Sequence, residues 1–145
     1  RPWTLAFRAL YRLLGLADPF LRSIWLSQGL GNVVLVTITG RKTGRPRQIL
    51  LGLLVAEGQW YLGHPNGPAH WTHNLDSAGG HLLVTWPGQP AVRFGSELLA
   101  AGPERDRAIR ATNQHPFPGN LIYSLGRRHV DQAGRYYRLE LDPDG

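Results

Sequence analysis

The pattern of apolar positions changes its period at residue 33 of this chain. Before that point, apolar side chains recur every three or four residues, which predicts a helix over residues 2–15 that ends near Gly15; the positions are Trp3, Phe7, Leu10 and Leu14. Asp18 and Pro19 then provide an N-cap and a first-turn proline, so a second short helix is expected over about 19–27.

After residue 33, short apolar runs with β-branched residues, separated by Gly and Pro, predict strands. Six such runs are present: 33–39, 48–55, 59–63, 81–86, 91–99 and 136–141. The first three are joined by connections too short for a crossover, so we expect an antiparallel meander. Helical patterns over 70–78, 103–113 and 120–127 lie between the other runs.

This order predicts a mainly β, α+β fold: a small six-stranded antiparallel barrel with appended helices. A length of 145 residues suits one structural domain. Within it, we distinguish an N-terminal helical segment, residues 1–32, from the barrel, residues 33–145.

Composition narrows the class of protein. The chain contains no cysteine, which excludes disulfides and thiolate metal sites, and it carries a net charge of +6, which favours anionic partners. No apolar run is long enough for a transmembrane helix. The helix predicted over 2–15 has Arg8 and Arg12 beside its apolar positions, so it suits either core packing or contact with an anionic membrane surface. The chain does not begin with methionine, so we expect its native start to be missing.

The connection between the first two predicted strands gathers an unusual amount of positive charge. Residues 40–48 read Gly-Arg-Lys-Thr-Gly-Arg-Pro-Arg-Gln. Four cations in one turn repel each other, so an anion is the simplest partner, although a solvated loop or a nucleic-acid patch would also tolerate them. Lys42 is the only lysine among sixteen basic residues, which suggests a specific point charge.

A second group of candidate residues follows the third predicted strand. His64, His70 and His73 fall within ten residues, but no carboxylate stands at a spacing typical of a zinc site, so no metal is expected. The serines lack a nucleophile elbow, and no carboxylate pair, dinucleotide fingerprint or phosphate-binding P-loop is present. Trp71 and Asn74, with the glycine-bearing loop before them, would suit a flat heteroaromatic ligand whose anionic tail reaches the basic turn.

These two motifs together resemble the deazaflavin-dependent nitroreductase family. The resemblance rests on Gly40-Arg41-Lys42-Thr43-Gly44 with Pro46-Arg47 after it, and on Trp71-Thr72-His73-Asn74-Leu75 beyond a hairpin; it covers roughly residues 30–142. Membership would imply a split β-barrel, like that of flavin mononucleotide (FMN)-binding proteins, which binds coenzyme F-420, a deazaflavin with a phosphate and a polyglutamate tail.

The resemblance also implies roles for particular residues. The phosphate and tail would be held by Arg41, Lys42, Thr43 and Arg47, and the next part of the groove would be lined by Gln48 and Ile49. The deazaflavin ring would be approached by Gly63, His64, Pro65 and Asn66, and the pocket completed by His70, Trp71, His73 and Asn74. Tyr123 matches a family tyrosine near the substrate, and either Tyr123 or His73 is a candidate catalytic proton donor.

The chain departs from the family pattern mainly at the ring and substrate end. Thr72 stands where the family usually has tyrosine, Ala78-Gly79-Gly80 replaces Ala-Asn-Pro, and a tyrosine expected near Asn120 is missing. The motif at the phosphate end is intact.

The expected function is therefore an F-420-dependent oxidoreductase that transfers a hydride to a small conjugated acceptor such as a quinone, an enone or a nitro compound. Alternatives are a split barrel that binds FMN, haem or another tetrapyrrole, and a non-catalytic module that binds anions or a membrane. The expected partner is a small-molecule substrate and not nucleic acid, with residues 1–15 as a candidate for peripheral membrane contact. The expected location is cytoplasmic, with or without that contact.

Overall fold

The computed structural model describes residues 2–16, 31–66, 69–115 and 119–142, and for residues 13–16 the backbone alone. Its strands are β1 Val33–Thr39, β2 Pro46–Gly52, β3 Leu54–Ala56, β4 Gln59–His64, β5 Leu82–Thr85, β6 Val92–Leu98 and β7 Arg135–Leu141. Its helices are α1 Pro2–Leu16, α3 His70–Ser77, α4 Pro103–Arg110, the 3-10 turn Ala111–Gln114, α5 Gly119–Leu125 and α6 Arg127–Ala133. The helix expected over 19–27 lies outside the described residues.

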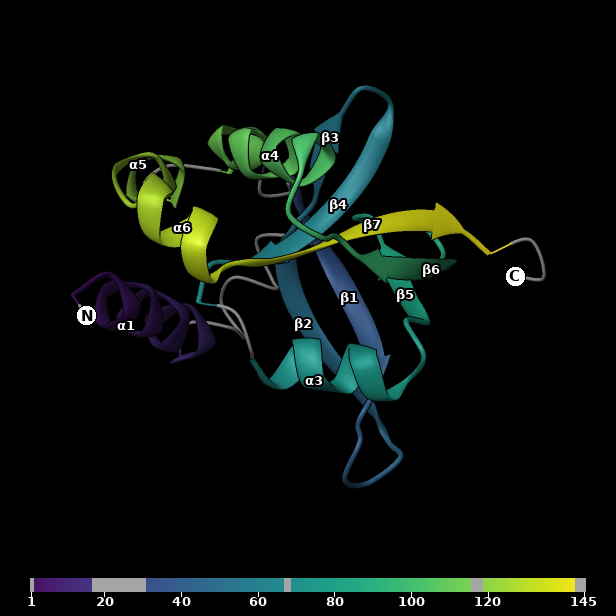
Figure 1. Cartoon of the computed structure of the whole chain (residues 1–145). Helices are drawn as coiled ribbons and strands as arrows, with labels where there is room; N and C mark the ends of the chain where they lie inside the picture. Colours follow the sequence, from purple (N-terminus) through teal and green to yellow (C-terminus); the bar gives the residue numbers. More distant parts are fainter. Residues whose placement is uncertain (1, 17–30, 67–68, 116–118, 143–145) are drawn as a thin grey trace.

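The strands form one antiparallel sheet in the order β2-β1-β5-β6-β7-β4-β3. The two edge strands, β2 and β3, are consecutive in the chain and are separated only by Leu53. The sheet is therefore strongly curled, which brings its two edges close to each other (Figure 1). This curled sheet is a split barrel, as predicted, but it has seven strands and not six.

The extra strand arises because the run expected as one strand over 48–55 is divided. Residues up to Gly52 pair with β1, whereas Leu54 pairs with Tyr61 of β4. Between them, Leu53 belongs to neither strand pairing, and its backbone N–H donates a hydrogen bond to the carbonyl of Asn32, 2.8 Å away. At Gly52, a Cβ would lie 2.2 Å from the imidazole of His115, so glycine lets that ring pack against the chain at the break. The apolar pattern continues through the break, so it contains no sign of the change of partner.

Two separate cores cover the two faces of the curled sheet. Inside the curl, side chains of β1, β2, β4, β5, β6 and β7 pack with Trp71 and Leu75 of α3. On the outer face, Tyr61 and Tyr136 pack beneath α1, α4, α5 and α6. Figure 1 shows α3 on the opposite side of the molecule from α4, beside the β1–β2 hairpin. The short polar α6 had no counterpart in the sequence-based expectations; its buried side chains, His129 and Val130, are too few to make a clear helical pattern.

Helix α1 directs its apolar side into the outer core. Phe7 is fully buried, and Trp3 and Leu10 pack against the same core. The outward positions carry Arg8, Arg12 and Leu5, whose side chain is 64% exposed. Contact of this segment with an anionic membrane stays a prediction, and it would have to use these outward residues. Within the described chain, none of the helices has the length and apolar character needed to cross a membrane.

The free edge of β3 is covered by one side chain. The Gln114 carboxamide accepts a hydrogen bond from the Val55 N–H (2.9 Å) and donates one to the Val55 carbonyl (2.7 Å). A single amide therefore satisfies both main-chain groups, as a neighbouring strand would, and protects an exposed edge.

Replacing Gln114 by alanine is expected to lower the free energy of unfolding by about 1 kcal/mol, since it removes two partly solvated hydrogen bonds. Urea unfolding would measure this change, and hydrogen exchange should show loss of protection at the Val55 amide. The exposed neighbour Asn113, replaced by alanine, is the matched control. Unchanged exchange at Val55 would contradict the assigned role.

Candidate functional site

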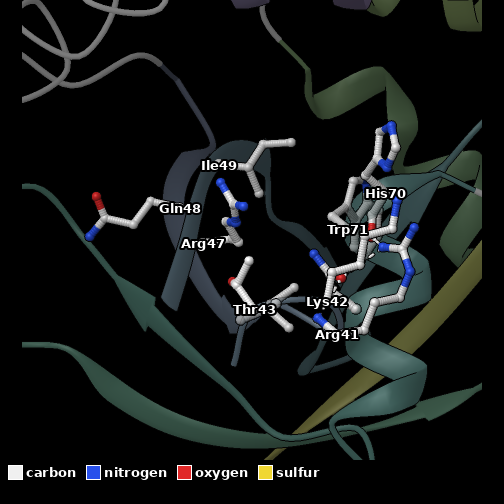
Figure 2. A pocket seen from close by; sticks show the side chains of 11 residues that line it. Arg41, Lys42, Thr43, Arg47, Gln48, Ile49, His70 and Trp71 are labelled. Carbon is white, nitrogen blue, oxygen red and sulfur yellow. Dashed lines mark hydrogen bonds between the residues drawn. The ribbon is translucent and has the colours of Figure 1, made fainter. Parts of the chain in front are cut away.

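A pocket of about 400 Å³ lies between the β1–β2 hairpin and helix α3. Its volume is in the range of pockets that bind small ligands. The hairpin contributes Ile38, Gly40, Arg41, Lys42, Thr43, Arg47, Gln48 and Ile49, and α3 contributes His70, Trp71 and Asn74. The two motifs that stand out in the sequence are thus brought together in three dimensions (Figure 2).

The basic turn has a defined backbone conformation. The Gly40 N–H donates to the Arg45 carbonyl (2.8 Å), and the Gly44 N–H donates to the Gly40 carbonyl (2.9 Å). Gly44 adopts a φ of +69°, which glycine tolerates without strain. Thr43 Oγ1 accepts a hydrogen bond from the Arg45 N–H (3.2 Å), which leaves its hydroxyl hydrogen for another acceptor.

The positive charge of this turn is not neutralised by any carboxylate of the described residues. Arg41, Lys42, Arg45 and Arg47 are all exposed. Among the residues that the structure describes, none of the four forms an ion pair with a carboxylate, whereas Arg105, Arg107, Arg135 and Arg138 all do. The turn therefore presents a concentrated positive potential at the mouth of the pocket.

A side chain of α3 holds the turn in place. Asn74 Oδ1 accepts hydrogen bonds from the Arg41 backbone N–H (3.1 Å) and from Arg41 Nη1 (2.8 Å). Arg41 Nη1 also lies 3.3 Å from the His70 carbonyl oxygen, to which it donates. Part of the Arg41 guanidinium is thus committed to α3, so Lys42 and Arg47 are the pocket cations with the most freedom to meet a ligand.

The start of β2 forms another wall of the pocket. In the β1–β2 register, Arg47 is opposite Ile38 and Ile49 is opposite Val36, so both share the inner face of the sheet. Gln48 is opposite Thr37 on the other face, and Figure 2 shows its side chain pointing away from the others. Gln48 therefore borders the pocket without directing its side chain into it.

Helix α3 supplies the aromatic wall. The Trp71 side chain is 5% exposed, and its indole Nε1 is a buried donor without a hydrogen-bond partner in the described part of the chain. An unsatisfied buried N–H of this kind is rare in folded proteins. His70 is exposed at the pocket, whereas His73 is exposed elsewhere on the helix and does not line it.

The departure at Thr72 has a local structural role. Thr72 is fully buried, and its Oγ1 accepts from the Ala69 N–H (2.7 Å) and donates to the Ala69 carbonyl (2.9 Å). These bonds close the first turn of α3. Thr72 does not line the pocket, so this substitution does not alter the pocket wall directly.

The residues expected around the deazaflavin ring are not part of this pocket. His64 is buried, with its ring 6.3 Å from that of Trp71 and 5.0 Å from that of Tyr11. Burial lowers the pKa of His64 to about 4, and its Nδ1 accepts from the Asn66 N–H (3.3 Å). Pro65 is buried beside it. Trp71 therefore lies between His64 and the pocket, with contacts to both.

Gly63 and Asn66 have packing roles in the outer core. A Cβ at Gly63 would lie 2.1 Å from Cε1 of the buried Tyr136 ring, so only glycine permits this contact. Asn66 Nδ2 donates to the Thr4 carbonyl (3.2 Å) and its Oδ1 is 2.8 Å from His129 Nε2, which ties β4 to α1 and α6.

Tyr123, one candidate proton donor, is also outside the pocket. It is 3% exposed, and its hydroxyl is 2.9 Å from that of Tyr11. Burial, with the nearby Tyr11 and Tyr136, raises the pKa of Tyr123 well above its usual value. Neither Tyr123 nor His73 lines the pocket, so a catalytic role for them stays a prediction.

Sequence reasoning missed two residues of the pocket, Ile38 and Gly40. Ile38 could have been found from strand alternation, because it shares a face with buried Val34 and Val36. Gly40 lies where a Cβ would be 3.1 Å from the Arg45 carbonyl, a contact that only the folded turn reveals. In the described part of the chain, no three His, Asp or Glu side chains gather as a metal site would require.

Comparison with known proteins supports the fold. No family model matches the chain, and no curated protein does. Among solved structures, an F-420-H2 dependent reductase, FDR-A, is 19% identical with a TM-score of 0.57, over 75% of this chain and 94% of that one. HutZ, the haem storage protein of Vibrio cholerae, is 12% identical with a TM-score of 0.53, over 86% and 89%. A haem-binding protein of Mycobacterium smegmatis is 15% identical with a TM-score of 0.52, over 77% and 46%. Such identities establish the shared split-barrel fold and nothing finer.

Proposed function

We propose that this split-barrel protein binds coenzyme F-420 through the pocket between the basic turn and α3, and that it acts as an oxidoreductase. The observation that carries the proposal is a concave site with exposed cations, none of them in an ion pair with a carboxylate of the described chain, next to an aromatic wall. That combination suits a ligand with an anionic group attached to a flat conjugated part.

The residues present fit such a ligand. Lys42 and Arg47 would hold the phosphate, and the Thr43 hydroxyl has a hydrogen to donate to it. Trp71 and Ile49 offer an apolar surface to the flat part of such a ligand. The similarity in fold to an F-420-H2 dependent reductase favours this cofactor over other phosphorylated ligands.

When bound, F-420 would supply the hydride, and the proton that completes the reduced product would come from water or from a donor side chain such as His73 or Tyr123. The chain's contribution is binding and orientation. The basic turn would anchor the charged end, and the Arg41–Asn74 hydrogen bonds would keep the turn at a set position relative to α3. The acceptor we propose is a small conjugated molecule such as a quinone, an enone or a nitro compound.

The test is a titration of the purified protein with F-420, FMN and haem, followed by fluorescence and absorbance. We expect saturable binding of F-420, weakened by high salt because the cations are exposed. Binding of FMN with no binding of F-420 would move the assignment to a flavin enzyme. Absence of binding to all three would refute the proposed function.

Haem is the second candidate ligand, and two observations favour it. His70 presents an exposed imidazole at the pocket, and two of the similar structures are haem proteins. His64 is less suited to bind iron, because it is buried between two aromatic rings and its Nδ1 accepts a hydrogen bond. A haem absorbance band that changes in His70→Ala but not in His73→Ala would favour this alternative over F-420.

A further inference from the structure

Asp76 lies on α3 but does not line the pocket, and each of its carboxylate oxygens accepts a hydrogen bond from a side chain of β7. Oδ2 accepts a hydrogen bond from Arg135 Nη2 (2.9 Å), and Oδ1 accepts one from the Tyr137 hydroxyl (3.0 Å). Arg135 Nε in turn donates to the Tyr137 hydroxyl oxygen (3.2 Å). The three side chains form a closed ring of hydrogen bonds.

Tyr137 connects this ring to the pocket. Its side chain is 2% exposed, and its aromatic ring packs on Trp71 with centroids 5.8 Å apart and planes tilted by 54°. Trp71 is the aromatic wall of the pocket. The position of the Tyr137 ring therefore bears directly on the position of Trp71.

Helix α3 is held on two sides by different parts of the sheet. Asn74 bonds to Arg41 in the turn after β1, and Asp76 bonds to β7, with β5 and β6 between those two strands in the sheet. Residues two apart on a helix point in nearly opposite directions. The helix thus spans the curled sheet, tied at one side by Asn74 and at the other by Asp76.

An ordinary surface ion pair would not explain this arrangement. The Asp76 and Arg135 side chains are 44% and 29% exposed, so their attraction alone contributes little. The Tyr137 hydroxyl is different, because it belongs to a buried residue and Asp76 is its acceptor. Removing that acceptor leaves a buried O–H unsatisfied unless the ring moves or water enters.

We propose that Asp76 is a positioning residue for the pocket. It orients the Tyr137 side chain, and Tyr137 in turn holds the position of Trp71, the aromatic wall on which the flat part of the ligand packs. This inference rests on the proposed function for the identity of the ligand. The charged end of the ligand is held by other residues, so Asp76 should affect only the binding of the flat part of the ligand.

The binding test compares two probes, F-420 and inorganic pyrophosphate. Asp76→Ala should weaken F-420 binding by about three- to tenfold, the effect of one net hydrogen bond, and leave pyrophosphate affinity unchanged. Asp76→Asn, which keeps an oxygen for Tyr137, should restore F-420 affinity. Asp131→Ala, which removes another partly exposed ion pair, is the matched control and should change neither. Equal weakening of both probes by Asp76→Ala would overturn the proposal.

A second readout does not depend on the cofactor. Acrylamide quenching, with the Trp71 contribution isolated by comparison with Trp71→Phe variants, should show greater access to Trp71 in Asp76→Ala and in Tyr137→Phe. Tyr137→Phe removes only the hydroxyl, so it serves if Asp76→Ala does not fold. Unchanged access in a folded variant would refute the role of Asp76. If the wild-type protein does not bind F-420, the proposed function fails, while this measurement still decides the role of Asp76.

Discussion

Alanine at Lys42 or Arg47 is expected to weaken F-420 binding by roughly ten- to a hundredfold, since each change removes one charge-assisted contact with an anion. Both side chains line the pocket, both are exposed, and neither forms an ion pair with a carboxylate of the described chain. Their charge is therefore available to a ligand without breaking an internal contact. Titrations at low ionic strength would measure the effect.

The loss should appear in affinity and much less in the turnover of bound cofactor. The anchored group is remote from the reacting atoms, so its contacts stabilise the bound state and the transition state almost equally. Saturating cofactor should then restore activity. A fall in turnover that saturating cofactor does not restore would show that these cations act on the chemistry and not as anchors.

Two other arginines separate a specific contact from a general charge effect. Arg110 of α4 is exposed and far along the chain from the turn, and Arg45 lies in the turn without lining the pocket. Each alanine variant removes the same charge as Arg47→Ala. We expect a change below about threefold for Arg110→Ala at moderate salt, because α4 lies on the opposite side of the molecule from the turn and a distant exposed charge is screened (Figure 1). Arg45→Ala should cost more than Arg110→Ala and less than Arg47→Ala, because Arg45 adds to the potential of the turn without lining the pocket. Equal losses at Arg110 and Arg47 would mean that net charge alone drives binding.

Mild acid is expected to destabilise the fold strongly, because two histidines are held neutral. Burial lowers the pKa of both His64 and His115 to about 4, from 6.5. Above pH 6.5, both histidines are neutral in the folded and in the unfolded protein, so they do not lower the free energy of unfolding. As the pH falls from 6.5 towards 4, the histidines bind protons in the unfolded protein but not in the folded one, so the free energy of unfolding decreases. The full loss is about 3 kcal/mol for His64. His115 has the same lowered pKa, so its contribution should be similar.

Urea unfolding between pH 7.5 and 5 isolates this effect, because ordinary carboxylates bind few protons there. The free energy of unfolding should fall by about 1.2 kcal/mol per pH unit for each fully effective histidine near pH 5.5. His64→Asn, which keeps an acceptor for the Asn66 N–H, should flatten the slope even if it lowers stability at neutral pH. His73→Asn on the exposed side of α3 is the control. A flat profile in the wild-type protein would contradict the proposed burial penalty.

Most of the order of strands and helices, the basic turn and the α3 motif could be predicted from local patterns, whereas α6 and the division between β2 and β3 could not. Alternation over 33–39 and the Gly and Pro residues around the turn are local signals, and β1 was found with its observed bounds. The bounds of α1 and α3 also came within one residue of those predicted. Such signals depend on near neighbours in the chain, so they survive without knowledge of the fold.

The same sequence gave no sign of how distant segments meet. An apolar run that changes partner at Leu53 has the same pattern as a single strand, because the apolar side chains are buried in either case. Likewise, the resemblance to the nitroreductase family implied that His64 and Tyr123 lie near the ligand. In the structure neither lines the pocket: His64 is buried beside Trp71, and Tyr123 is buried in the outer core.

The functional role of a side chain depended most on the tertiary structure. Arg41 and Asn74 were both expected to hold the ligand; both line the pocket, and a hydrogen bond 2.8 Å long also joins them to each other, which only the fold reveals. Asp76 had no assigned role until the fold placed it beside Tyr137. The sequence by itself determines which chemical groups the chain carries and how they are spaced. Which of these groups remain available to a ligand is decided by hydrogen bonds between distant residues, such as Arg41 with Asn74, 33 positions apart, and Asp76 with Tyr137, 61 positions apart.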